Sequence, residues 1–459
     1  MEKTKMNFVE VGKIAGKIIN ETLPEIDVNL VVTQEEYKHR WQKIQVKLKE
    51  KGYDVGYACG SEMDRSDIAW MAGVFDPIVE RYGILIGVEG PPVILAGSEG
   101  GHVVAEAKDR SGAEVSLLRE FQISDEDYRH TKFDTLENVL KKMGVPKNGK
   151  AAIFASSEFV PYHHVVMLQA IFGSDNVSFD PLLLQLIKYE KSEKELAICQ
   201  MSNIVSDAAF RAMLAVCVPG MTELQVAGAG DFVMKELGAG RQGFPTIVTA
   251  GKRGYTIIGP ATNNRIQEGD IVSMGISGTF NGYHGIIRRT IRAGKNFSPD
   301  QMEVVRAVEG LYTTVMDATI EAAKTNAPSN TIDLKGKEYI AKLKLKALDG
   351  SIVTPQEPYT FIHNAGCSEA SEGYGAITPY TQTPIGERAT LMCDVALKGF
   401  INKGEPLFNI LYAVVEDSLW KCSKEAGVYN RLPINVQHLV GNTEPLGNNI
   451  NPYHKYFSL

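Results

Sequence analysis

The chain has 459 residues, a formal net charge of −7 and a hydrophobic fraction of 44%, the profile of a globular protein long enough for two domains. The acidic balance argues against nucleic acid or an anionic membrane as a partner, because no basic excess displaces counterions. Six scattered cysteines without a C-x-x-C spacing predict a cytoplasmic protein. The absence of about 18 consecutive apolar residues argues against a membrane span.

Residues 1–188 alternate helical and strand-like patterns, which predicts an α/β domain. Thr33 to Glu36 has the pattern of a capping box, and we expect it to open a helix that runs to Lys51. Short apolar runs between glycines and prolines predict buried strands, and two helical segments alternate with a further strand. In chain order these segments are 52–59, 82–88, 92–96, 133–143, 151–154 and 162–172.

A charged junction follows, and we place the second domain at residues 189–459. Ser192 and Glu195 have capping-box spacing, and apolar positions recur at helical intervals as far as Met213. The pattern predicts helices over 219–237, 299–326 and 334–346, a strand over 246–255, and apolar, strand-like runs at 389–395, 407–415 and 436–440.

The most informative stretch is a predicted β-hairpin over residues 268–291. A polar turn precedes an apolar strand that starts at Ile271, and Phe280-Asn281-Gly282 reverses the chain into a second strand. Asn-Gly between two apolar runs is a strong hairpin signal, because both residues tolerate a positive φ.

This hairpin and four further motifs resemble the catalytic half of the creatinase, prolidase and methionine aminopeptidase family, peptidase family M24. The four motifs are Lys191-Ser-Glu-Lys-Glu-Leu196, His363-Asn-Ala-Gly366, Leu391-Met-Cys-Asp394 and Val414-Val-Glu-Asp417. The resemblance implies an α/β (α+β) protein with an N-terminal creatinase-like α/β domain and a C-terminal pita-bread domain. Most members of the family hold two metal ions there.

Matching the hairpin to the family pattern shows that metal-ligand positions are lost. The first two carboxylate positions fall on Gly275 and Ile286, which cannot coordinate a metal. The histidine position is His363, and the final glutamate is Glu416. The remaining glutamate position falls near Met392 or Cys393, with no carboxylate before Asp394. We therefore expect no metal ion and no other cofactor.

Creatinase has this fold and works without metal, so the leading prediction is a metal-independent hydrolase of creatinase type that cleaves a C–N bond of a small polar molecule. The position of its proton-shuttling histidine corresponds to Ile258 here. His363 or His284 must then move the proton. We predict His363, His284 and Glu416 as the catalytic residues.

The resemblance implies that Ile286 replaces an inward-facing ligand, so strand alternation places His284 and Arg288 on the pocket face of the second hairpin strand and Tyr283 on the opposite face. A guanidinium grips a carboxylate through two hydrogen bonds, so Arg288 is predicted to bind an anionic substrate group. An internal ion pair of Arg288 with Glu416 or Asp394 is equally open. Tyr283 and Asp394 complete the predicted substrate contacts of this domain.

Cys367 follows His363 by four residues and is predicted either as a substrate-contacting thiol, with nucleophilic chemistry open to it, or as a buried inert residue. In creatinase-like homodimers the N-terminal domain reaches toward the partner's site. The matching segment here, 74–83, supplies Glu80 and Arg81 as further substrate contacts. We thus expect a homodimer that acts on a small molecule.

Three other functions remain open at this point. The same fold with metal would be an Xaa-Pro aminopeptidase or prolidase, which elemental composition distinguishes. A lyase or a cysteine-dependent enzyme is the second alternative. A non-catalytic protein that binds peptides or other proteins is the third.

Overall fold

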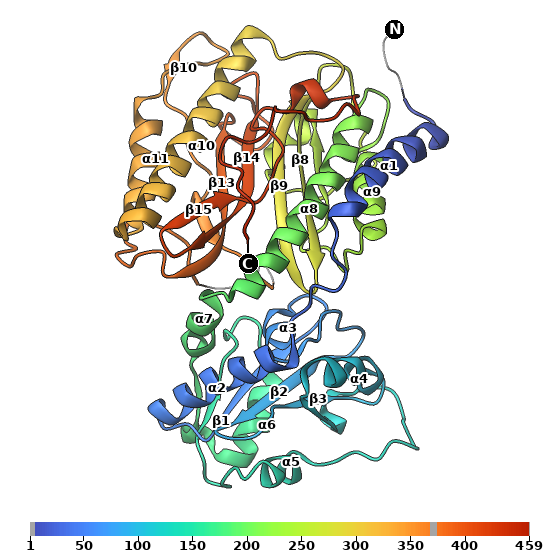
Figure 1. Ribbon diagram of the computed structural model, residues 1–459, viewed down its shortest axis with the longest axis vertical. Coiled ribbons are helices and arrows are strands. Elements are labelled where there is room, and N and C mark those ends of the chain that lie inside the picture. Colours follow the sequence, from blue (N-terminus) through green and yellow to red (C-terminus); the bar gives the residue numbers. More distant parts are fainter. Residues whose placement is uncertain (1–4, 368–373, 459) are drawn as a thin grey trace. The chain divides into compact units, whose positions relative to one another are not determined.

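The structure is a computed structural model that describes residues 5–367 and 374–458. The chain forms two compact units, and each is described by itself (Figure 1). Unit 1 comprises Met1–Leu30, Lys191–Gly366 and Gly375–Leu459, and unit 2 comprises Val31–Glu190 and Cys367–Tyr374. Within the described residues no helix is both long enough and apolar enough to span a bilayer.

The unit boundary at Glu190 lies close to the predicted junction, but the first thirty residues differ from the prediction. They group with the C-terminal part because helix α1 (Phe8–Thr22) buries Ala15, Ile18 and Ile19 in the core of unit 1. The sequence pattern of α1 shows an apolar face and does not show which domain that face covers.

Unit 2 contains a six-stranded sheet in the order β4-β3-β2-β1-β5-β6. The β1–β2 and β2–β3 pairs are antiparallel, and the other three pairs are parallel. Thr33 caps α2 through a hydrogen bond from the Glu36 amide, as predicted. The helices are α2 (Gln34–Lys51), α3 (Ser66–Ala72), α4 (Gly100–Ser111), α5 (Leu136–Lys142), α6 (Tyr162–Phe172) and α7 (Pro181–Tyr189). The strands are β1 (Val55–Gly60), β2 (Tyr82–Gly87), β3 (Val93–Ala96), β4 (Glu114–Leu117), β5 (Ala151–Ile153) and β6 (Val177–Phe179).

Unit 1 is built on an antiparallel sheet in the order β12-β13-β14-β9-β8-β7, with β15 also paired to β14. Its strands are β7 (Ile247–Ala250), β8 (Ile271–Phe280), β9 (Tyr283–Arg292), β12 (Ile362–Asn364), β13 (Arg388–Lys398), β14 (Tyr412–Cys422) and β15 (Glu425–Val428). A separate small ladder joins β10 (Leu345–Lys346) to β11 (Ile352–Val353). The mixed two-domain α/β fold that the sequence predicts is confirmed, but the apolar run near 436–440 forms a 3₁₀ turn, Gln437–Leu439.

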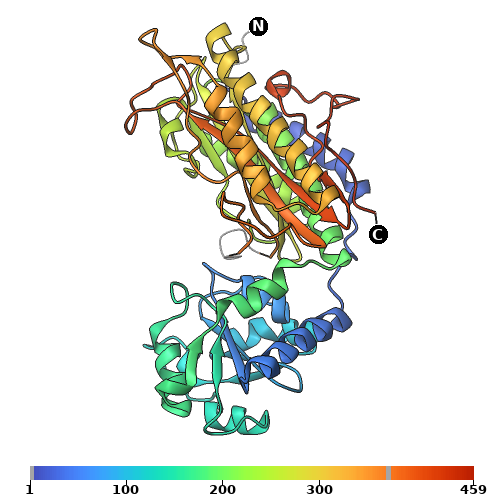
Figure 2. The same cartoon turned by 90° about the vertical axis from the view of Figure 1, so that its left-hand side faces the viewer.

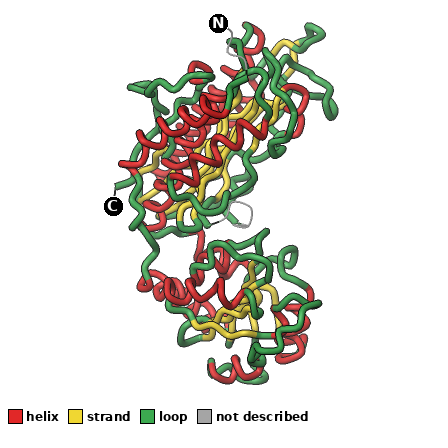
Figure 3. Tube along the Cα trace, turned by 90° about the vertical axis from the view of Figure 1, so that its right-hand side faces the viewer, coloured by secondary structure: helices red, strands yellow, loops and turns green. Residues whose placement is uncertain are grey.

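Four helices besides α1 belong to unit 1: α8 (Glu193–Val216), α9 (Glu223–Glu236), α10 (Pro299–Thr325) and α11 (Asn330–Lys342). The predicted capping box of α8 is present, with Ser192 and Glu195 bonded reciprocally. Helix α8 packs on β8 and β9, and α10 packs on β13 and β14. Figure 2 shows α10 and α11 side by side, and Figure 3 shows helices covering strands in each unit.

The β8–β9 hairpin turns at Asn281 and Gly282, whose φ angles are +48° and +79°. This is the conformation that Asn-Gly favours, and it sets a ten-pair register from Ile271 opposite Arg292 to Phe280 opposite Tyr283. Ile287 and Ile291 of β9 lie in the core shared with α8 and α9. The alternate side chains of β9 therefore face away from α8 and α9, and that opposite face carries the candidate site.

Candidate metal and substrate site

The strand register aligns four residues in one row across the sheet. Asp394 of β13 lies opposite Glu416 of β14, Glu416 lies opposite Arg288 of β9, and Arg288 lies opposite Gly275 of β8. Neighbouring Cα atoms in such a row are about 5 Å apart. Residues more than a hundred positions apart in the sequence therefore present their side chains to one place.

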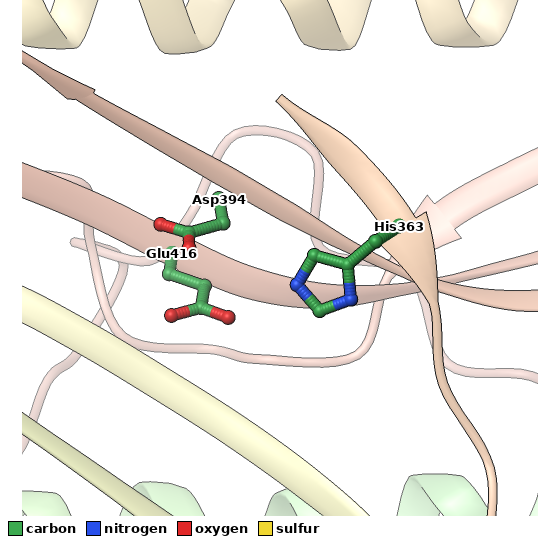
Figure 4. A group of neighbouring side chains, drawn as sticks. All are labelled: His363, Asp394 and Glu416. Atoms are coloured by element: carbon green, nitrogen blue, oxygen red, sulfur yellow. The ribbon is translucent and has the colours of Figure 1, made fainter. Parts of the chain in front are cut away.

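His363 of β12 joins this row from the next strand. It pairs with Met392, two residues before Asp394, and the Asp394 amide donates to the Phe361 carbonyl 2.9 Å away. His363, Asp394 and Glu416 each offer a donor atom, and these atoms lie within 4.8 Å of one another. The imidazole Nε2 points toward the two carboxylates (Figure 4). The structure thus brings together three predicted site residues.

Asp394 takes a more central place than the sequence match gave it. The match located the lost glutamate position near Met392 or Cys393, and Asp394 appeared only among the substrate contacts. Asp394 is the carboxylate that faces His363 and Glu416, whereas Cys393 has the opposite parity on β13. A register offset of one or two residues is enough to hide a ligand position from sequence matching.

Arg288 is bound inside the protein. Its Nη1 donates to Asp394 Oδ2 at 3.2 Å and to Glu416 Oε2 at 3.1 Å, and its side chain is only 3% exposed. Its Nη2 donates to the Tyr412 hydroxyl at 2.7 Å and to the Ile257 carbonyl at 3.1 Å. Of the two roles left open by the sequence, the internal ion pair is the one this geometry supports.

Two tyrosines complete the site, and the sequence analysis missed both. The Tyr359 hydroxyl donates to Asp394 Oδ1 at 2.9 Å and is also hydrogen-bonded to the Tyr412 hydroxyl. Tyr412 lies on β14 four residues before Glu416, so strand parity alone would have assigned it to the site face. Tyr359 precedes β12 in a loop, and no local pattern marks it.

Burial sets the electrostatics of the site. It raises the pKa of the Asp394 carboxyl, although the nearby Arg288 charge acts in the opposite direction. Burial also opposes the charged form of Arg288, but the surrounding tyrosines, Asp394 and Glu416 together keep its pKa well above the ordinary value. The pKa values of Tyr359 and Tyr412 are raised, mainly by burial. Arg288 is therefore a fixed positive charge at every physiological pH.

A two-metal centre does not fit these residues. Gly275 has no side chain, and Ile286 packs with Ala365, Met392 and Phe244 in a small apolar cluster on the site face. One metal ion does fit: a histidine and two carboxylates converge from three adjacent strands, which is a donor set suited to a divalent transition metal. The donors are placed by a sheet register, so they do not depend on loop conformation.

Two other predicted residues of β9 lie outside this group. His284 is buried on the same strand, and its amide donates to the Gly366 carbonyl at 3.0 Å, but its ring is not among the three converging donors. Tyr283 points the other way, because its hydroxyl donates to Glu195 Oε1 of α8 at 2.6 Å. Tyr283 and Arg288 thus lie on opposite faces of the sheet, as predicted, and Tyr283 does not lie on the face that carries the candidate site.

The remaining predicted contacts lie in unit 2. Glu80 is buried and accepts a hydrogen bond from the Gly100 amide at 2.7 Å, so it holds the start of α4. Arg81 is exposed, and Cys367 is a buried cysteine without a disulfide. Burial disfavours thiolate chemistry at Cys367. Glu369 and Glu372, two carboxylates that follow Cys367 in the sequence, lie outside the described residues.

Comparison with known proteins finds a family match and relatives for part of the chain. The model of metallopeptidase family M24 matches residues 198–388. An Xaa-Pro dipeptidase from Pyrococcus horikoshii is 30% identical over 155 residues, which are 33% of this chain and 42% of that relative. An Xaa-Pro dipeptidase from Pyrococcus furiosus is 27% identical over 252 residues, or 52% of this chain and 66% of the relative. Each alignment spans less than two thirds of the relative's length.

The fold agrees with solved prolidase structures. The prolidase from Pyrococcus horikoshii OT3 superposes with a TM-score of 0.67 at 20% identity, covering 88% of this chain and all of that one. An Xaa-Pro dipeptidase from Bacillus anthracis gives 0.67 at 18% identity, covering 87% of this chain and 99% of that one. Residues 198–388 thus match metallopeptidase family M24, and the fold is that of the solved prolidases, with a C-terminal pita-bread domain.

These findings overturn the functional prediction made from the sequence. A metal-independent creatinase-type hydrolase was expected because two ligand positions are lost, but the related proteins are Xaa-Pro dipeptidases and the matching domain is that of a metallopeptidase family. The prediction compared the ligand positions with those of a two-metal centre, and two of them are lost. Three donors, His363, Asp394 and Glu416, nevertheless remain close together.

Proposed function

We propose that this protein is a metal-dependent peptidase that hydrolyses short peptides with proline in the second position, using one divalent ion held by His363, Asp394 and Glu416. The observation that carries the proposal is the convergence of these three donors within 4.8 Å on adjacent strands. The substrate class follows from its relatives, which are named Xaa-Pro dipeptidases and Xaa-Pro aminopeptidases.

When bound, a divalent ion at such a site supplies Lewis-acid chemistry to the carbonyl oxygen of the scissile amide. The chain's own residues prepare that site. Tyr359 holds Asp394 Oδ1, while Arg288 holds Asp394 Oδ2 and Glu416 Oε2, so neither carboxylate turns away from His363. The His363 Nδ1 lies 3.1 Å from the Asn364 carbonyl, and a proton donated there leaves Nε2 as the ligand atom.

The test is peptide hydrolysis by chelator-treated protein that is reconstituted with Mn²⁺, Co²⁺ or Zn²⁺. Ala-Pro and Ala-Pro-Ala separate a dipeptidase from an aminopeptidase, and Ala-Ala reports selectivity for proline. We expect metal-dependent cleavage of one of the proline peptides and little cleavage of Ala-Ala. His363→Ala should lower kcat/KM by more than about 100-fold, the upper range for losing a residue that only supports a ligand.

His438→Ala is the matched control, because His438 is an exposed histidine of the same unit and lies outside the site. Its kcat/KM should equal that of the wild type. Absence of proline-peptide cleavage with every metal, in protein shown to be folded, would contradict the proposal. Binding of the peptides without cleavage would assign the non-catalytic alternative instead.

The homodimer and the cytoplasmic location stay predictions from the sequence, as do the roles of Glu80 and Arg81 as substrate contacts. Sedimentation velocity of the full chain tests the first. Loss of affinity for the peptide in Arg81→Ala, with the metal content unchanged, tests the last.

A further inference from the structure

Arg288 has no freedom to leave the carboxylates. Both terminal nitrogens of its guanidinium are used, by Asp394 and Glu416 on one side and by Tyr412 and the Ile257 carbonyl on the other. Ile257 itself has φ +61°, an unfavourable conformation for a β-branched residue, and this turn directs its carbonyl to the arginine. Backbone strain at that point is retained next to the site.

Gly275 provides the room for this arginine. A Cβ atom at residue 275 would lie 2.3 Å from Arg288 Cγ and 3.0 Å from its Cδ. The aliphatic part of Arg288 therefore lies over the glycine of the neighbouring strand. Any side chain at residue 275 would collide with it, so the glycine and the arginine conformation require each other.

The charges of the group limit what else it holds. Asp394 and Glu416 carry two negative charges when ionised, and Arg288 neutralises one of them at hydrogen-bond distance. Two of the three donor residues thus already share a cation. The one negative charge that remains suits a single divalent ion, and that ion would meet the guanidinium across a short, poorly hydrated distance.

We propose that Arg288 is a permanent cation of the site, locked over Gly275, that competes with a divalent ion for the carboxylates of Asp394 and Glu416. The inference rests on the proposed metal site and goes beyond it, because it assigns Arg288 as a positioning and charge-limiting residue. The arginine orders both carboxylates before any metal arrives, and its charge weakens their hold on a divalent ion.

The test is calorimetric titration of Mn²⁺ into chelator-treated full-length protein, with metal content measured after dialysis. We expect one equivalent in the wild type. Arg288→Met, which removes the charge and keeps most of the volume, should bind Mn²⁺ about ten-fold or more tightly, because the competing cation is gone. Arg288→Lys keeps the charge and should retain the wild-type affinity.

Gly275→Ala tests the same inference without touching a donor or the arginine. Its methyl group displaces the Arg288 side chain, so we expect tighter Mn²⁺ binding, as in Arg288→Met. Gly278→Ala is the matched control on the same strand, because its Cβ would meet Ser206, Val205 and Met234 at 3.0–3.4 Å on the helix side. Its Mn²⁺ titration should match that of the wild type.

The two proposals fail in different ways. If wild-type protein binds one Mn²⁺ and cleaves proline peptides but Arg288→Met and Gly275→Ala leave stoichiometry and affinity unchanged, the role of Arg288 is refuted and the function stands. If the wild type binds no Mn²⁺ while both variants bind it, the proposed function is refuted and the charge-limiting role stands. Should Arg288→Met not fold, Gly275→Ala decides.

Discussion

The residues next to the site residues form a second buried ion pair, and breaking it should cost much of the stability of unit 1. Arg289 Nη2 donates to Asp417 Oδ1 at 2.9 Å and Oδ2 at 3.0 Å, with the two side chains 1% and 0% exposed. Arg289 Nη1 also donates to the Glu416 carbonyl at 2.8 Å. This pair lies on the helix face and pins β9 to β14, the pairing that sets Arg288 opposite Glu416.

Arg289→Met leaves the Asp417 charge buried, with only Tyr312 and Asn451 still donating to it. Removing one partner of such a pair costs about 3–5 kcal/mol. Because a domain is typically stable by about 5–15 kcal/mol, this loss is about a fifth or more of the total. The double variant Arg289→Met/Asp417→Asn removes the uncompensated charge, so its loss should be smaller than the sum of the single losses by about 1–3 kcal/mol.

Urea unfolding followed by Trp420 fluorescence measures this effect. The chain has three tryptophans, and Trp420 lies on β14, so a Trp41→Phe/Trp70→Phe background leaves one reporter in unit 1. Both replaced residues belong to unit 2, which keeps the background change away from the pair. A loss below about 1 kcal/mol in Arg289→Met, the range of an exposed pair, would refute the argument.

Two further predictions concern the hydroxyl next to Arg288 and a buried histidine of unit 2. Tyr412→Phe removes one acceptor of Arg288 Nη2, so the free energy of unfolding of unit 1 should fall by about 1 kcal/mol, as measured by urea unfolding. The Mn²⁺ stoichiometry, measured by calorimetric titration, should stay that of the wild type. Loss of Mn²⁺ binding would contradict the assignment. His164 Nδ1 lies 2.7 Å from the Tyr57 hydroxyl, and burial lowers the pKa of His164 in the folded protein to about 3. In the unfolded chain the pKa of this histidine is about 6.5, so between these two pH values the unfolded state binds more protons than the folded state. The free energy of unfolding of unit 2 should therefore be highest above about pH 6.5 and fall by up to about 1.4 kcal/mol per pH unit below that value. His164→Phe should flatten this pH dependence, whereas the control His163→Phe, at the exposed neighbouring residue, should keep it. Equal slopes in the wild type and both variants would contradict the prediction.

The hairpin was predictable because its signals are local. Asn281 and Gly282 fix the turn, and alternation then assigns Arg288 and Tyr283 to opposite faces, as the structure has them. The helix that begins after Ser192 was predictable for the same reason, because a capping box lies within four residues. Short-range patterns carry both features.

The site chemistry depended on pairings that no local pattern carries. Asp394 reaches His363 and Glu416 only through the register of three strands, and Tyr359 enters from a loop. Arg288 was predicted on the correct face, but whether its guanidinium binds a substrate or an internal carboxylate depends on the room that Gly275 provides. Long-range register and side-chain volume therefore decided what the sequence left open.

The most direct test of the account is Ala-Pro and Ala-Pro-Ala hydrolysis by chelator-treated wild-type protein as Mn²⁺ is added in fractions of an equivalent. We predict no turnover before addition, a linear rise, and saturation at one equivalent, with His363→Ala inactive throughout. Turnover that persists after chelation, or saturation only at two equivalents, would contradict a peptidase with a single metal ion at His363, Asp394 and Glu416.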